Sequence, residues 1–556
     1  MTLPAGKRRV SVVVAGGGPV GMIAAIELGR RGVSCVLLND RPTTATHPKA
    51  NAISSRTMEH LRRLGLARAV RARGLDDDHP TDLAYFTRLS GYEIGRYRQP
   101  SRREALAEAA SGTGRWASAE PPHRCSQLFL EAELKQAVDA LPAVEVRFGW
   151  RLEEFRDRGD RVEALARRSD GADEIVYEAG YLIGCDGAGS GVRAALGIEL
   201  AGESGVIRPI MGGPMYATYF EADPAAGWLA QDPAWQYWIL NPEFRALFIP
   251  VDGGDKFLFI TALGTGDGGM RDPAAAIRRA AGADFPLRVI SSQNWTAGYA
   301  LVAERYRRGR VFLAGDAAHL FTPTGGMGMN TGIDDAVNLA WKLAGEIAGW
   351  GGGFLVDSYE AERRPIARRN TAFASRFADS IGHMPVDAAI EEAGAAGREA
   401  RAALGRLVEA HAHFEFTIPG IFLGLSYAGS PIVAGDGSSP PPDDPNAYTP
   451  NACPGARAPH AWLAGGALHD VLGPEFTLLR FGDAADPAPL LAAAGVPGLP
   501  LAVATVEDPA ARAIYGADLV LIRPDHHVAW RGNRLPRDCR TLVDLARGAG
   551  QTQTTT

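Results

Sequence analysis

The stretch Val10-Ser11-Val12-Val13-Val14-Ala15-Gly16-Gly17-Gly18-Pro19-Val20-Gly21 decides the fold of this chain. Its β-branched first half is typical of a buried parallel strand, and the glycines follow it with the spacing GxGxxG. Residues 22–30 then carry apolar side chains at helical spacing, and residues 33–38 form a second apolar run. Glycines at these positions let the backbone turn tightly and approach a pyrophosphate, while the helix N-terminus offers unpaired N–H groups to the phosphates. The order strand, glycine-rich turn, helix, strand therefore predicts a dinucleotide-binding site.

The end of the second strand differs from the usual dinucleotide-binding pattern. An Asp or Glu normally ends this strand and binds the ribose hydroxyls, but Asn39 occupies the expected position and Asp40 follows it. An asparagine side chain can hydrogen-bond to a hydroxyl, although it carries no charge. Asn39, Asp40 and the adjacent Arg41 are therefore all candidates for this contact.

The charge balance excludes other classes of protein. The 556 residues contain 58 Lys and Arg against 64 Asp and Glu, a net charge of −6, with no basic tail and no Lys/Arg run beyond Lys7–Arg9. Because nucleic-acid binding depends on clustered positive charge, we predict no nucleic-acid partner. No run of 18 or more apolar residues occurs, so we expect a cytoplasmic protein without a membrane partner.

The cysteines and the paired histidines give no sign of a metal site. The five cysteines are widely spaced and include no CxxC pair, which excludes a zinc ribbon and a redox dithiol. A sparse, odd number of cysteines is typical of a reducing compartment. The pairs His411-x-His413 and His526-His527 are expected to be surface or loop features rather than metal ligands.

A second GxGxxG motif occurs at residues 264–269, after an apolar strand at 257–263. Asp272-Pro273 starts a separate helix soon after it, and no second strand ending in an acid follows at the required distance. We therefore interpret this motif as a flexible strand-to-helix link, not as a second nucleotide site.

Two motifs far along the chain extend the N-terminal pattern. Residues 181–187 contain a strand that ends in an Asp-Gly turn, and residues 310–319 contain another strand followed by Gly-Asp. A long helix with apolar spacing begins near Gly328 and would point its positive end at a group bound before it. His319 is expected to be a packed, hydrogen-bonded histidine, not a catalytic base.

With these three motifs in order, the chain resembles the FAD-dependent aromatic hydroxylases, which are single-component flavoprotein monooxygenases with the p-hydroxybenzoate hydroxylase fold. The resemblance covers roughly residues 9–380. Shorter pieces also match the family, and these are Arg56-Thr57-Met58-Glu59, Gln127 with Leu130-Glu131, and Ser358-Tyr359-x-x-Glu362-Arg363-x-Pro365. Residues 425–437 and 452–550 are similar to the longer members, the phenol, chlorophenol and polyketide hydroxylases, which carry an appended thioredoxin-like domain.

The resemblance implies how FAD is held. Asp316 is expected to hydrogen-bond to the ribityl chain, which Gln127 also contacts, while Lys49 and Arg56 approach the phosphates. Pro323 is expected to line the isoalloxazine ring. With the N-terminal motif included, the candidate FAD-binding residues are Gly16, Gly18, Pro19, Val20, Gly21, Asn39, Asp40, Arg41, Lys49, Arg56, Gln127, Asp186, Gly315, Asp316, Pro323, Gly326, Gly328, Met329 and Asn330.

One position of the Asp-Gly motif departs from the family. The resemblance implies that Asp186 serves both flavin and NADPH function, but the family's usual arginine is replaced here by Gly189. Its contact is therefore missing or supplied elsewhere. The chain contains no separate motif for NADH or NADPH.

The resemblance implies an α/β fold with a Rossmann-like FAD-binding domain, an interleaved β-sheet substrate domain and a C-terminal thioredoxin-like α/β domain. The expected boundaries are 1–75, 100–195 and 300–380 for the FAD-binding domain, 76–99 and 196–299 for the substrate domain, 381–437 for a helical segment and linker, and 438–556 for the thioredoxin-like domain without CxxC.

Runs of alternating apolar and polar residues that are rich in aromatic side chains indicate the strands of the substrate region. These strands are expected at 215–220, 236–240, 245–250 and 256–263. The candidate substrate contacts among their aromatic side chains are Tyr216, Tyr219, Trp238 and Phe248, with Tyr237 and Trp295 as further candidates. Helices are expected within residues 388–412, a linker at 438–445, and C-terminal strands at 476–481, 502–504 and 519–523.

The implied activity is hydroxylation of a phenolic or polyketide-type aromatic ring by FAD, with NADPH or NADH and O₂, through a flavin C4a-hydroperoxide. A small aromatic substrate and O₂ are the expected partners, and a homo-oligomer is left open. One alternative is a flavin oxidoreductase of the same fold that performs epoxidation, Baeyer–Villiger oxidation or dehydrogenation. Another is a non-catalytic flavin-binding protein.

Overall fold

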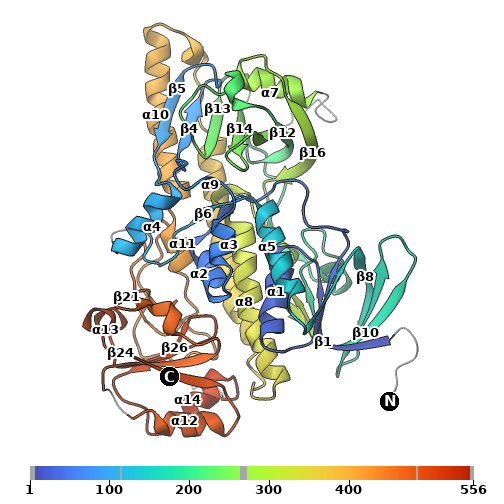
Figure 1. Ribbon diagram of the computed structural model, residues 1–556, viewed down its shortest axis with the longest axis vertical. Coiled ribbons are helices and arrows are strands. Elements are labelled where there is room, and N and C mark those ends of the chain that lie inside the picture. The colour runs from blue at the N-terminus through green and yellow to red at the C-terminus, as the bar shows by residue number, and fades with distance from the viewer. Residues whose placement is uncertain (1–6, 113–114, 244, 263–271, 484–485, 551–556) are drawn as a thin grey trace.

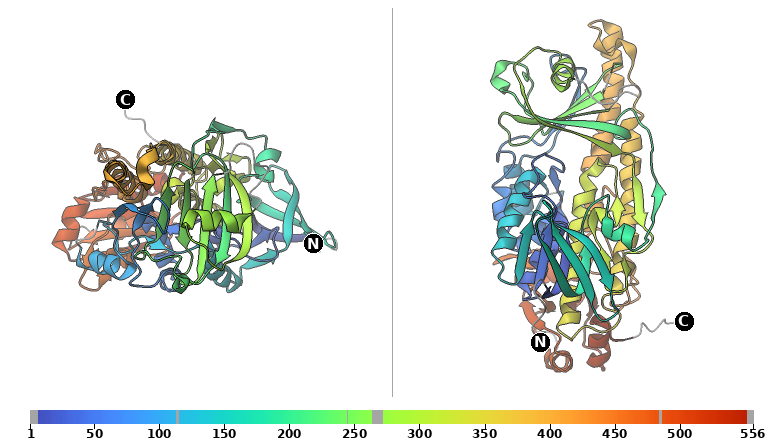
Figure 2. Two further views of the ribbon diagram at one scale, coloured as in Figure 1. Left: turned by 90° about the horizontal axis from the view of Figure 1, so that it is seen from above. Right: turned by 90° about the vertical axis from the view of Figure 1, so that its right-hand side faces the viewer.

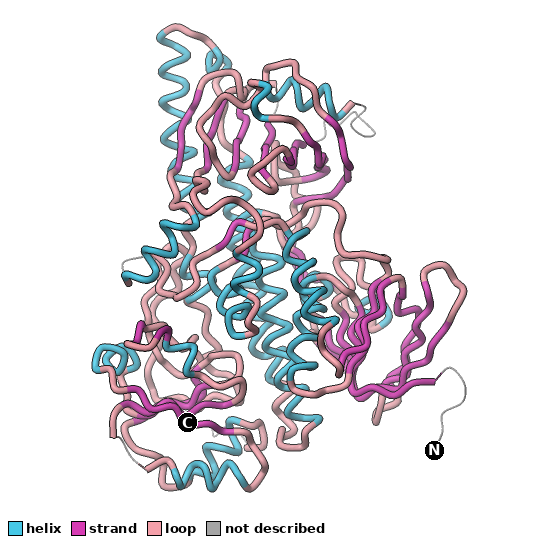
Figure 3. Tube along the Cα trace, viewed as in Figure 1, coloured by secondary structure: helices cyan, strands magenta, loops and turns pink. Residues whose placement is uncertain are grey.

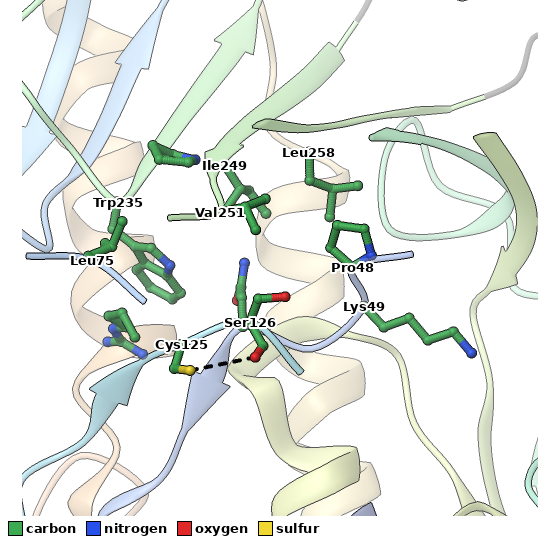
Figure 4. A pocket seen from close by; sticks show the side chains of 12 residues that line it. Pro48, Lys49, Leu75, Cys125, Ser126, Trp235, Ile249, Val251 and Leu258 are labelled. Carbon is green, nitrogen blue, oxygen red and sulfur yellow. Dashed lines mark hydrogen bonds between the residues drawn. The ribbon is translucent and has the colours of Figure 1, made fainter. Parts of the chain in front are cut away.

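The computed structural model describes residues 7–112, 115–243, 245–262, 272–483 and 486–550. The chain folds as an α/β protein whose strands gather in three main sheets, which form separate groups in Figure 3. The second GxGxxG motif, at residues 264–269, lies outside the described residues.

The first main sheet contains the glycine-rich turn and is built around parallel strands. Its strand order is β18-β19-β10-β1-β2-β7, and the antiparallel strands β9 and β8 extend it beside β10. The apolar run that follows Val10 is completely buried, as a central parallel strand requires. The bounds are β1 (Lys7–Ala15), β2 (Cys35–Asn39), β7 (Val144–Phe148), β8 (Trp150–Asp157), β9 (Val162–Arg168), β10 (Glu174–Gly184), β18 (Arg307–Arg308) and β19 (Val311–Leu313).

Helices cover this sheet and connect its strands. The helix that follows the glycine-rich turn packs against the long helix α8, and the two make the most extensive helix–helix contact of the described chain. Small side chains such as Ala24 and Ala25 allow this close approach because they add little bulk between the helix backbones. The bounds are α1 (Pro19–Arg30), α2 (Ser55–Arg63), α3 (Ala67–Arg71), α5 (Gln127–Asp139), α6 (Gly191–Ala195) and α8 (Met327–Ile347).

The second main sheet has seven strands and lies at the upper end of the molecule in Figure 1. Its order is β16-β12-β15-β14-β13-β4-β5, and every neighbouring pair is antiparallel except β13 and β4. The four expected strands between residues 215 and 263 are present, while β16 and the pair β4 and β5 were not predicted as strands. The bounds are β4 (Leu83–Phe86), β5 (Glu93–Tyr97), β12 (Gly213–Glu221), β13 (Gln236–Leu240), β14 (Arg245–Pro250), β15 (Lys256–Ala262) and β16 (Arg288–Ala297).

Two long helices, α9 and α10, run from the middle of the molecule to its upper end, as the right-hand view of Figure 2 shows. Helix α10 packs on β5 at the edge of the seven-stranded sheet and contacts α9. The helix expected within residues 388–412 is therefore confirmed, although it begins later and ends later. The bounds are α9 (Ser358–Gly382) and α10 (Ala395–Phe416), with the shorter helices α4 (Arg102–Ser111), α7 (Pro273–Ala281) and α11 (Pro419–Leu423).

Short strands and single turns join these parts. Two of the short sheets bring distant segments together, because β3 pairs with β6 and β17 pairs with both β11 and β20. The bounds of the strands are β3 (Ala52–Ile53), β6 (His123–Arg124), β11 (Leu200–Glu203), β17 (Ala300–Ala303), β20 (His319–Leu320), β21 (Trp462–Leu463) and β22 (Gly466–Ala467). The 3₁₀ turns are η1 (Pro224–Ala226), η2 (Gly315–Ala317), η3 (Thr324–Gly326), η4 (Ala388–Glu391) and η5 (Leu468–Val471).

The C-terminal region is a thioredoxin-like α/β domain. Its sheet has the order β24-β23-β25-β26, in which β24 is parallel to β23 and the other neighbours are antiparallel. The three expected strands are confirmed, and β26 was missed. The bounds are β23 (Phe476–Phe481), β24 (Leu501–Val506), β25 (Leu519–Ile522), β26 (Val528–Gly532), α12 (Ala488–Gly495), α13 (Pro509–Tyr515) and α14 (Cys539–Ala546).

Candidate active site

Three loops that are far apart in sequence leave the parallel sheet side by side. Ala15 is in register with Gly184 on the neighbouring strand, and Gly184 is in register with Leu313 on the next one. Because the three strands are parallel, the glycine-rich turn, the Asp-Gly motif and the Gly-Asp motif all follow strand ends at one edge. Ligands of open α/β sheets bind at this carboxyl edge.

The glycine-rich turn has room for a ligand at only one of its three glycines. A Cβ on Gly16 would lie 2.1 Å from the carbonyl oxygen of Cys185, and one on Gly21 would lie 1.9 Å from the carbonyl oxygen of Gly16. A Cβ on Gly18 would meet nothing within 4 Å. Gly16 and Gly21 therefore pack the turn against its surroundings, while Gly18 faces open space at the start of α1.

A cavity of about 770 Å³ connects this turn to the seven-stranded sheet. Its volume is within the usual range for cofactor and small-molecule sites. The predicted FAD-binding residues in its wall are Gly18, Pro19, Val20, Lys49, Gln127, Asp316, Pro323, Gly326, Gly328, Met329 and Asn330. The predicted residues outside its wall are Gly16, Gly21, Asn39, Asp40, Arg41, Arg56, Asp186 and Gly315.

The carboxyl group of Asp316 faces this cavity without a hydrogen-bond donor from the protein among the described residues. The side chain is exposed, and the surface that it exposes lines the cavity. Burial raises the pKa of Asp316, and the nearby His319 and Lys49 act in the opposite direction. Because the described protein donates no hydrogen bond to this carboxyl group and leaves it open to the cavity, it fits a ligand that brings hydroxyl groups, as a ribityl chain does.

The start of helix α8 closes the cavity near Pro323. Gly325 and Gly326 have φ values of +70° and +61°, a conformation that favours glycine, and α8 begins directly after them. The first backbone N–H groups of this 21-residue helix carry partial positive charge. An anionic ring system placed against Gly326 and Gly328 would be stabilised there.

Asn330 shapes the wall of the cavity through hydrogen bonds to two other segments. Its Oδ1 accepts hydrogen bonds from Ser54 N at 2.9 Å and from Thr57 Oγ1 at 2.7 Å. Its Nδ2 donates to the carbonyl oxygens of Gly326 and Ala52 at 2.6 and 3.0 Å. All four hydrogen-bonding positions of the Asn330 amide are therefore used to hold α2 and β3 against the start of α8.

Asp186 is engaged within its own loop. Its carboxylate accepts hydrogen bonds from Ser190 Oγ at 2.5 Å and from Val192 N at 3.0 Å, which stabilises the start of α6. Arg193 donates to the carbonyl oxygens of Ala317 at 3.0 Å and of Ala188 at 3.0 Å. Arg193 thus ties the Asp-Gly loop to the Gly-Asp loop, a connection that the sequence analysis did not predict.

The candidates at the end of β2 lie outside the cavity. Asn39 accepts a hydrogen bond from Gly17 N and donates to the carbonyl oxygen of Arg41, both at 3.2 Å. Its side chain therefore stabilises the glycine-rich turn. Asp40 and Arg41 are exposed to solvent.

Arg56 lies away from the cavity as well. It is buried and donates to Glu59 Oε2 at 3.0 Å and to the carbonyl oxygen of Asp525 at 2.5 Å. This arginine therefore joins α2 to the C-terminal domain.

His319 is packed behind the Gly-Asp loop, as predicted. Its Nε2 lies 2.6 Å from Asp335 Oδ2, which also accepts a hydrogen bond from Gly315 N at 3.1 Å. Arg363 donates to the other oxygen of Asp335 at 2.7 Å. Burial acts to raise the pKa of Asp335, but His319 and Arg363 overcome it and lower that pKa. This network fixes the loop that carries Asp316.

The seven-stranded sheet presents one face to the cavity. Trp238, Leu247 and Ala217 line the wall, together with Trp295. Phe248 and Tyr237 alternate with these positions and pack on the opposite face, in a cluster that includes Phe220 and Trp228.

The four predicted substrate contacts are therefore placed differently. Trp238 lines the cavity, whereas Phe248 and Tyr216 belong to the other face of the sheet. Tyr219 shares the face of Ala217 but lies beyond the wall, where its ring is 6.5 Å from that of His47. The sequence showed which strands were present but not which face of each met the cavity.

Glu415, near the end of α10, is a wall residue that the sequence analysis missed. Its Oε1 accepts a hydrogen bond from Gly325 N at 2.9 Å, and its Oε2 lies 2.8 Å from His411 Nε2. His411 Nδ1 lies 3.1 Å from Ser380 Oγ on α9, and Ser380 is half-buried. Glu415 therefore holds the loop beside Pro323 through one oxygen, while its other oxygen is in close contact with His411 but makes no hydrogen bond of normal geometry.

The paired histidines follow the prediction only in part. His413 is exposed, and His526 and His527 lie in the loop between β25 and β26, as expected for surface or loop features. His411, His526 and His527 are nevertheless buried, so a surface position is wrong for these three. In the described ranges of the chain, no cluster of three His, Cys, Asp or Glu residues could hold a metal ion. No helix in the described part of the chain is long and apolar enough to span a bilayer.

Comparison with known families defines the class of protein. Residues 9–374 match the model of the FAD binding domain, and residues 451–549 match that of the aromatic-ring hydroxylase C-terminal region. The chain therefore belongs to the FAD-dependent aromatic-ring hydroxylases, and it is a monooxygenase that binds FAD.

Individual relatives cover nearly the whole chain. An FAD-dependent monooxygenase of Emericella nidulans is 32% identical over 559 residues, which are 94% of this chain and 87% of that protein. The rebeccamycin biosynthetic enzyme RebC with reduced flavin has a TM-score of 0.87 at 34% identity and covers 98% of this chain and 100% of its own. Aklavinone-11 hydroxylase, in a complex with FAD and aklavinone, has a TM-score of 0.80 at 29% identity over 97% and 99% of the two chains.

Proposed function

We propose that the protein inserts one oxygen atom of O₂ into an aromatic ring of a phenolic or polyketide-type substrate, with NADH or NADPH as the electron donor. One observation carries this proposal: a single cavity joins the FAD cradle at the parallel sheet to a chamber lined by Trp235, Trp238 and Trp295. Flat apolar walls of this kind bind flat aromatic rings. The similar aklavinone-11 hydroxylase has been solved in a ternary complex with FAD and aklavinone, which supports a polyketide-type substrate.

The residues of the cradle fit FAD. Gly18 and the start of α1 would hold the pyrophosphate, Asp316 and Gln127 the ribityl chain, and Pro323 with Gly326 the ring system. When bound, FAD supplies the two electrons of NAD(P)H to O₂ and so provides the oxygen atom that the ring receives. The balanced reaction consumes one aromatic C–H substrate, O₂, NAD(P)H and a proton, and it gives the hydroxylated ring, water and NAD(P)⁺.

The protein contributes desolvation and proton transfer. The chamber walls exclude water from the reacting oxygen, which limits its loss as peroxide. A phenolate ring is richer in electrons than a phenol, so removal of the hydroxyl proton favours attack by an electrophilic oxygen. Glu415 faces the chamber beside Gly325 and is the acceptor that we assign for this proton, with His411 and Ser380 behind it.

The free cysteines support a location in a reducing compartment, and we propose the cytoplasm. Cys35, Cys125, Cys453 and Cys539 are buried thiols, and Cys185 is half-buried. Disulfides are rare in reducing compartments, where such thiols persist.

A panel of phenols, naphthols and hydroxyanthraquinones tests the proposed function. The FAD-loaded protein should oxidise NADH or NADPH quickly only when a ring that fits the chamber is present, and each turnover should give hydroxylated product. Trp238→Ala should weaken this stimulation, whereas Phe248→Leu on the opposite face should change it little. Oxidation of NAD(P)H that no aromatic compound stimulates, with no hydroxylated product, would contradict the proposal.

A further inference from the structure

A second, smaller hollow adjoins the substrate chamber. It measures about 40 Å³ and shares four wall residues with the large cavity, namely Trp116, Pro122, Arg124 and Phe416. At about 10–15 Å³ for each water-sized group, it has room for roughly three such groups. The hollow therefore accommodates a substituent of a few atoms on a ring that lies in the chamber.

Arg124, in β6, stands between the two spaces as a cation without a counter-charge. Its guanidinium carbon lies 3.7 Å from the centre of the Trp235 ring, and its Nη2 donates to Gln99 Oε1 at 3.2 Å. Among the residues that the structure describes, no carboxylate is within ion-pair distance of it. Burial alone lowers the pKa of Arg124 to about 9.

A guanidinium that is half-buried without a counter-charge is energetically costly. Removal of a charge from water is repaid only when an opposite charge and further hydrogen bonds compensate it. The cation–π contact with Trp235 offsets a part of that cost. Trp235 also packs edge-on against Phe416 with ring centres 5.7 Å apart, so the stack is held in place from the chamber side. The missing compensation for Arg124 is an anion.

Two other N–H donors at the small hollow also have no partner. Gln99 Nε2 is buried and makes no hydrogen bond, and its orientation is fixed because Arg124 can only donate and so must face Gln99 Oε1. Arg102 Nη1 is buried without a partner too, although the same side chain pairs with Asp77 through its other nitrogens. Both residues line the hollow. The remaining charged or titratable side chains of its wall are Asp76, His79, Arg115 and His123.

We infer that Arg124 and Gln99 form an anion subsite at the end of the substrate chamber, which binds a carboxylate carried by the aromatic substrate. This inference rests on the proposed function and narrows its substrate class to hydroxylated aromatic acids. A carboxylate has three heavy atoms, which matches the volume of the hollow, and its two oxygens can accept the N–H groups of Arg124 and Gln99. A dinucleotide pyrophosphate carries the same kind of charge but is far larger than the space.

Binding to the oxidised holoenzyme tests the subsite without any turnover. The dissociation constant of each probe is measured from the change in flavin absorbance. The probes come in pairs that differ only by a carboxylate, such as 1-hydroxy-2-naphthoate against 1-naphthol and salicylate against phenol. The wild-type protein should bind the carboxylated member of at least one pair about ten- to a hundredfold more tightly, as charge-assisted hydrogen bonds allow. Arg124→Met should reduce this ratio to below threefold, and Gln99→Leu should reduce it by a smaller factor.

Two controls separate binding from folding. Arg124→Met should keep its FAD and melt at the same or a higher temperature than wild type, because it removes a half-buried charge that has no counter-charge. Gln99→Leu, which keeps the Arg124–Trp235 stack, tests the subsite if Arg124→Met does not fold. Arg103→Met, at an exposed arginine paired with Asp78, should leave the ratio unchanged.

The inference is overturned if the wild-type protein shows no preference for any carboxylated probe, or if Arg124→Met and Gln99→Leu both retain the preference. It is also overturned if Arg124→Met weakens NADP⁺ binding tenfold while the preference for the carboxylated probes persists. Arg124 would then serve the nucleotide phosphate. A failure of hydroxylation in the proposed function would leave these binding ratios unaffected, so the two failures are distinguishable.

Discussion

Arg457, in the C-terminal region, and Glu59, on helix α2, form an ion pair inside the protein. Arg457 Nε lies 2.8 Å from Glu59 Oε2, and both side chains are almost completely buried. Although burial acts to raise it, the pKa of Glu59 is lowered well below its usual value by Arg457. Glu59 also pairs with Arg56, and Arg56 reaches Asp525. The thioredoxin-like domain is therefore joined to the FAD-binding domain through buried charges.

Loss of this pair should destabilise the whole protein. Arg457→Met removes the closest counter-charge of buried Glu59 and leaves it with Arg56, the Ser118 hydroxyl and His469 as neighbours. Breaking a buried ion pair costs about 3–5 kcal/mol. Chemical denaturation should therefore show a lower midpoint, with FAD affinity reduced because α2 holds Asn330 through Ser54 and Thr57. Arg103→Met is the matched control at an exposed pair and should leave the midpoint unchanged. Unaltered stability of Arg457→Met would contradict a bracing role for the C-terminal domain.

Two glycine-to-alanine substitutions in the glycine-rich turn should affect different properties, one FAD affinity and the other the stability of the fold. Gly18→Ala places a methyl group in open space, so the fold should persist while FAD affinity falls by about tenfold or more, because the pyrophosphate needs that space. Gly21→Ala would bring a methyl group within 1.9 Å of a carbonyl oxygen, so the folded protein itself should be lost or strongly destabilised. Thermal denaturation and flavin titration separate the two effects. Equal loss of stability in both variants would refute this division.

Asp316 should contribute to FAD affinity and not to stability. Because its carboxyl group makes no hydrogen bond to the described protein, Asp316→Ala leaves no partner unsatisfied. Loss of a hydrogen bond to a charged group costs about 1.5–3 kcal/mol, which corresponds to roughly 10- to 150-fold weaker FAD binding. Equilibrium dialysis with FAD checks this, with the melting temperature of the apoprotein as control. A variant that binds FAD as tightly as wild type would exclude Asp316 from the ribityl site.

Glu415→Gln should shift the pH dependence of turnover. Without a proton acceptor beside Gly325, hydroxylation should depend on the free phenol's own ionisation and rise with pH toward about 10. Reduction of FAD by NAD(P)H in the absence of O₂ should be unaffected, which separates proton transfer from a general structural defect. Glu415→Asp should restore part of the activity at neutral pH. A neutral-pH turnover rate equal to that of wild type would remove Glu415 from the mechanism.

Acid should destabilise the C-terminal domain at pH values above those at which carboxylates become protonated. Burial lowers the pKa of His460 to about 3, of His469 to about 4 and of His527 to about 3. Each histidine therefore stabilises the fold fully above pH 6.5, and this stability is lost as pH falls, by up to about 1.4 kcal/mol per pH unit for each group. Urea denaturation at pH 7.5 and 5.5 should show the loss. His469→Asn should weaken the pH dependence, and the exposed His383→Asn should not.

The sequence predicted the elements that local pattern controls. The GxGxxG turn, the strands that end at Gly184 and Leu313, and the helix after Gly326 all follow from apolar runs and glycine positions. Their convergence at one cavity follows because parallel strands end at the same edge of a sheet.

The rest of the site depends on packing that no local pattern encodes. Strand alternation is visible in the sequence around Phe248, but both faces of that sheet are apolar, so the face toward the cavity could not be chosen. Arg56 belongs to a family motif that also contains its partner Glu59, yet its other partner, the carbonyl oxygen of Asp525, comes from a segment 469 residues away. Glu415 and Arg124 reach the chamber only because α10 and β6 fold back against it, and nothing near them in sequence signals this.

The incorporation of ¹⁸O from labelled O₂ tests the central claim most directly. Here FAD-loaded protein, NAD(P)H and the aromatic compound that best stimulates NAD(P)H oxidation react under ¹⁸O₂ in unlabelled water. We predict that mass spectrometry will find one ¹⁸O atom on an aromatic carbon of the product. A product that carries only oxygen from water, or that is oxidised without any added oxygen, would contradict the account.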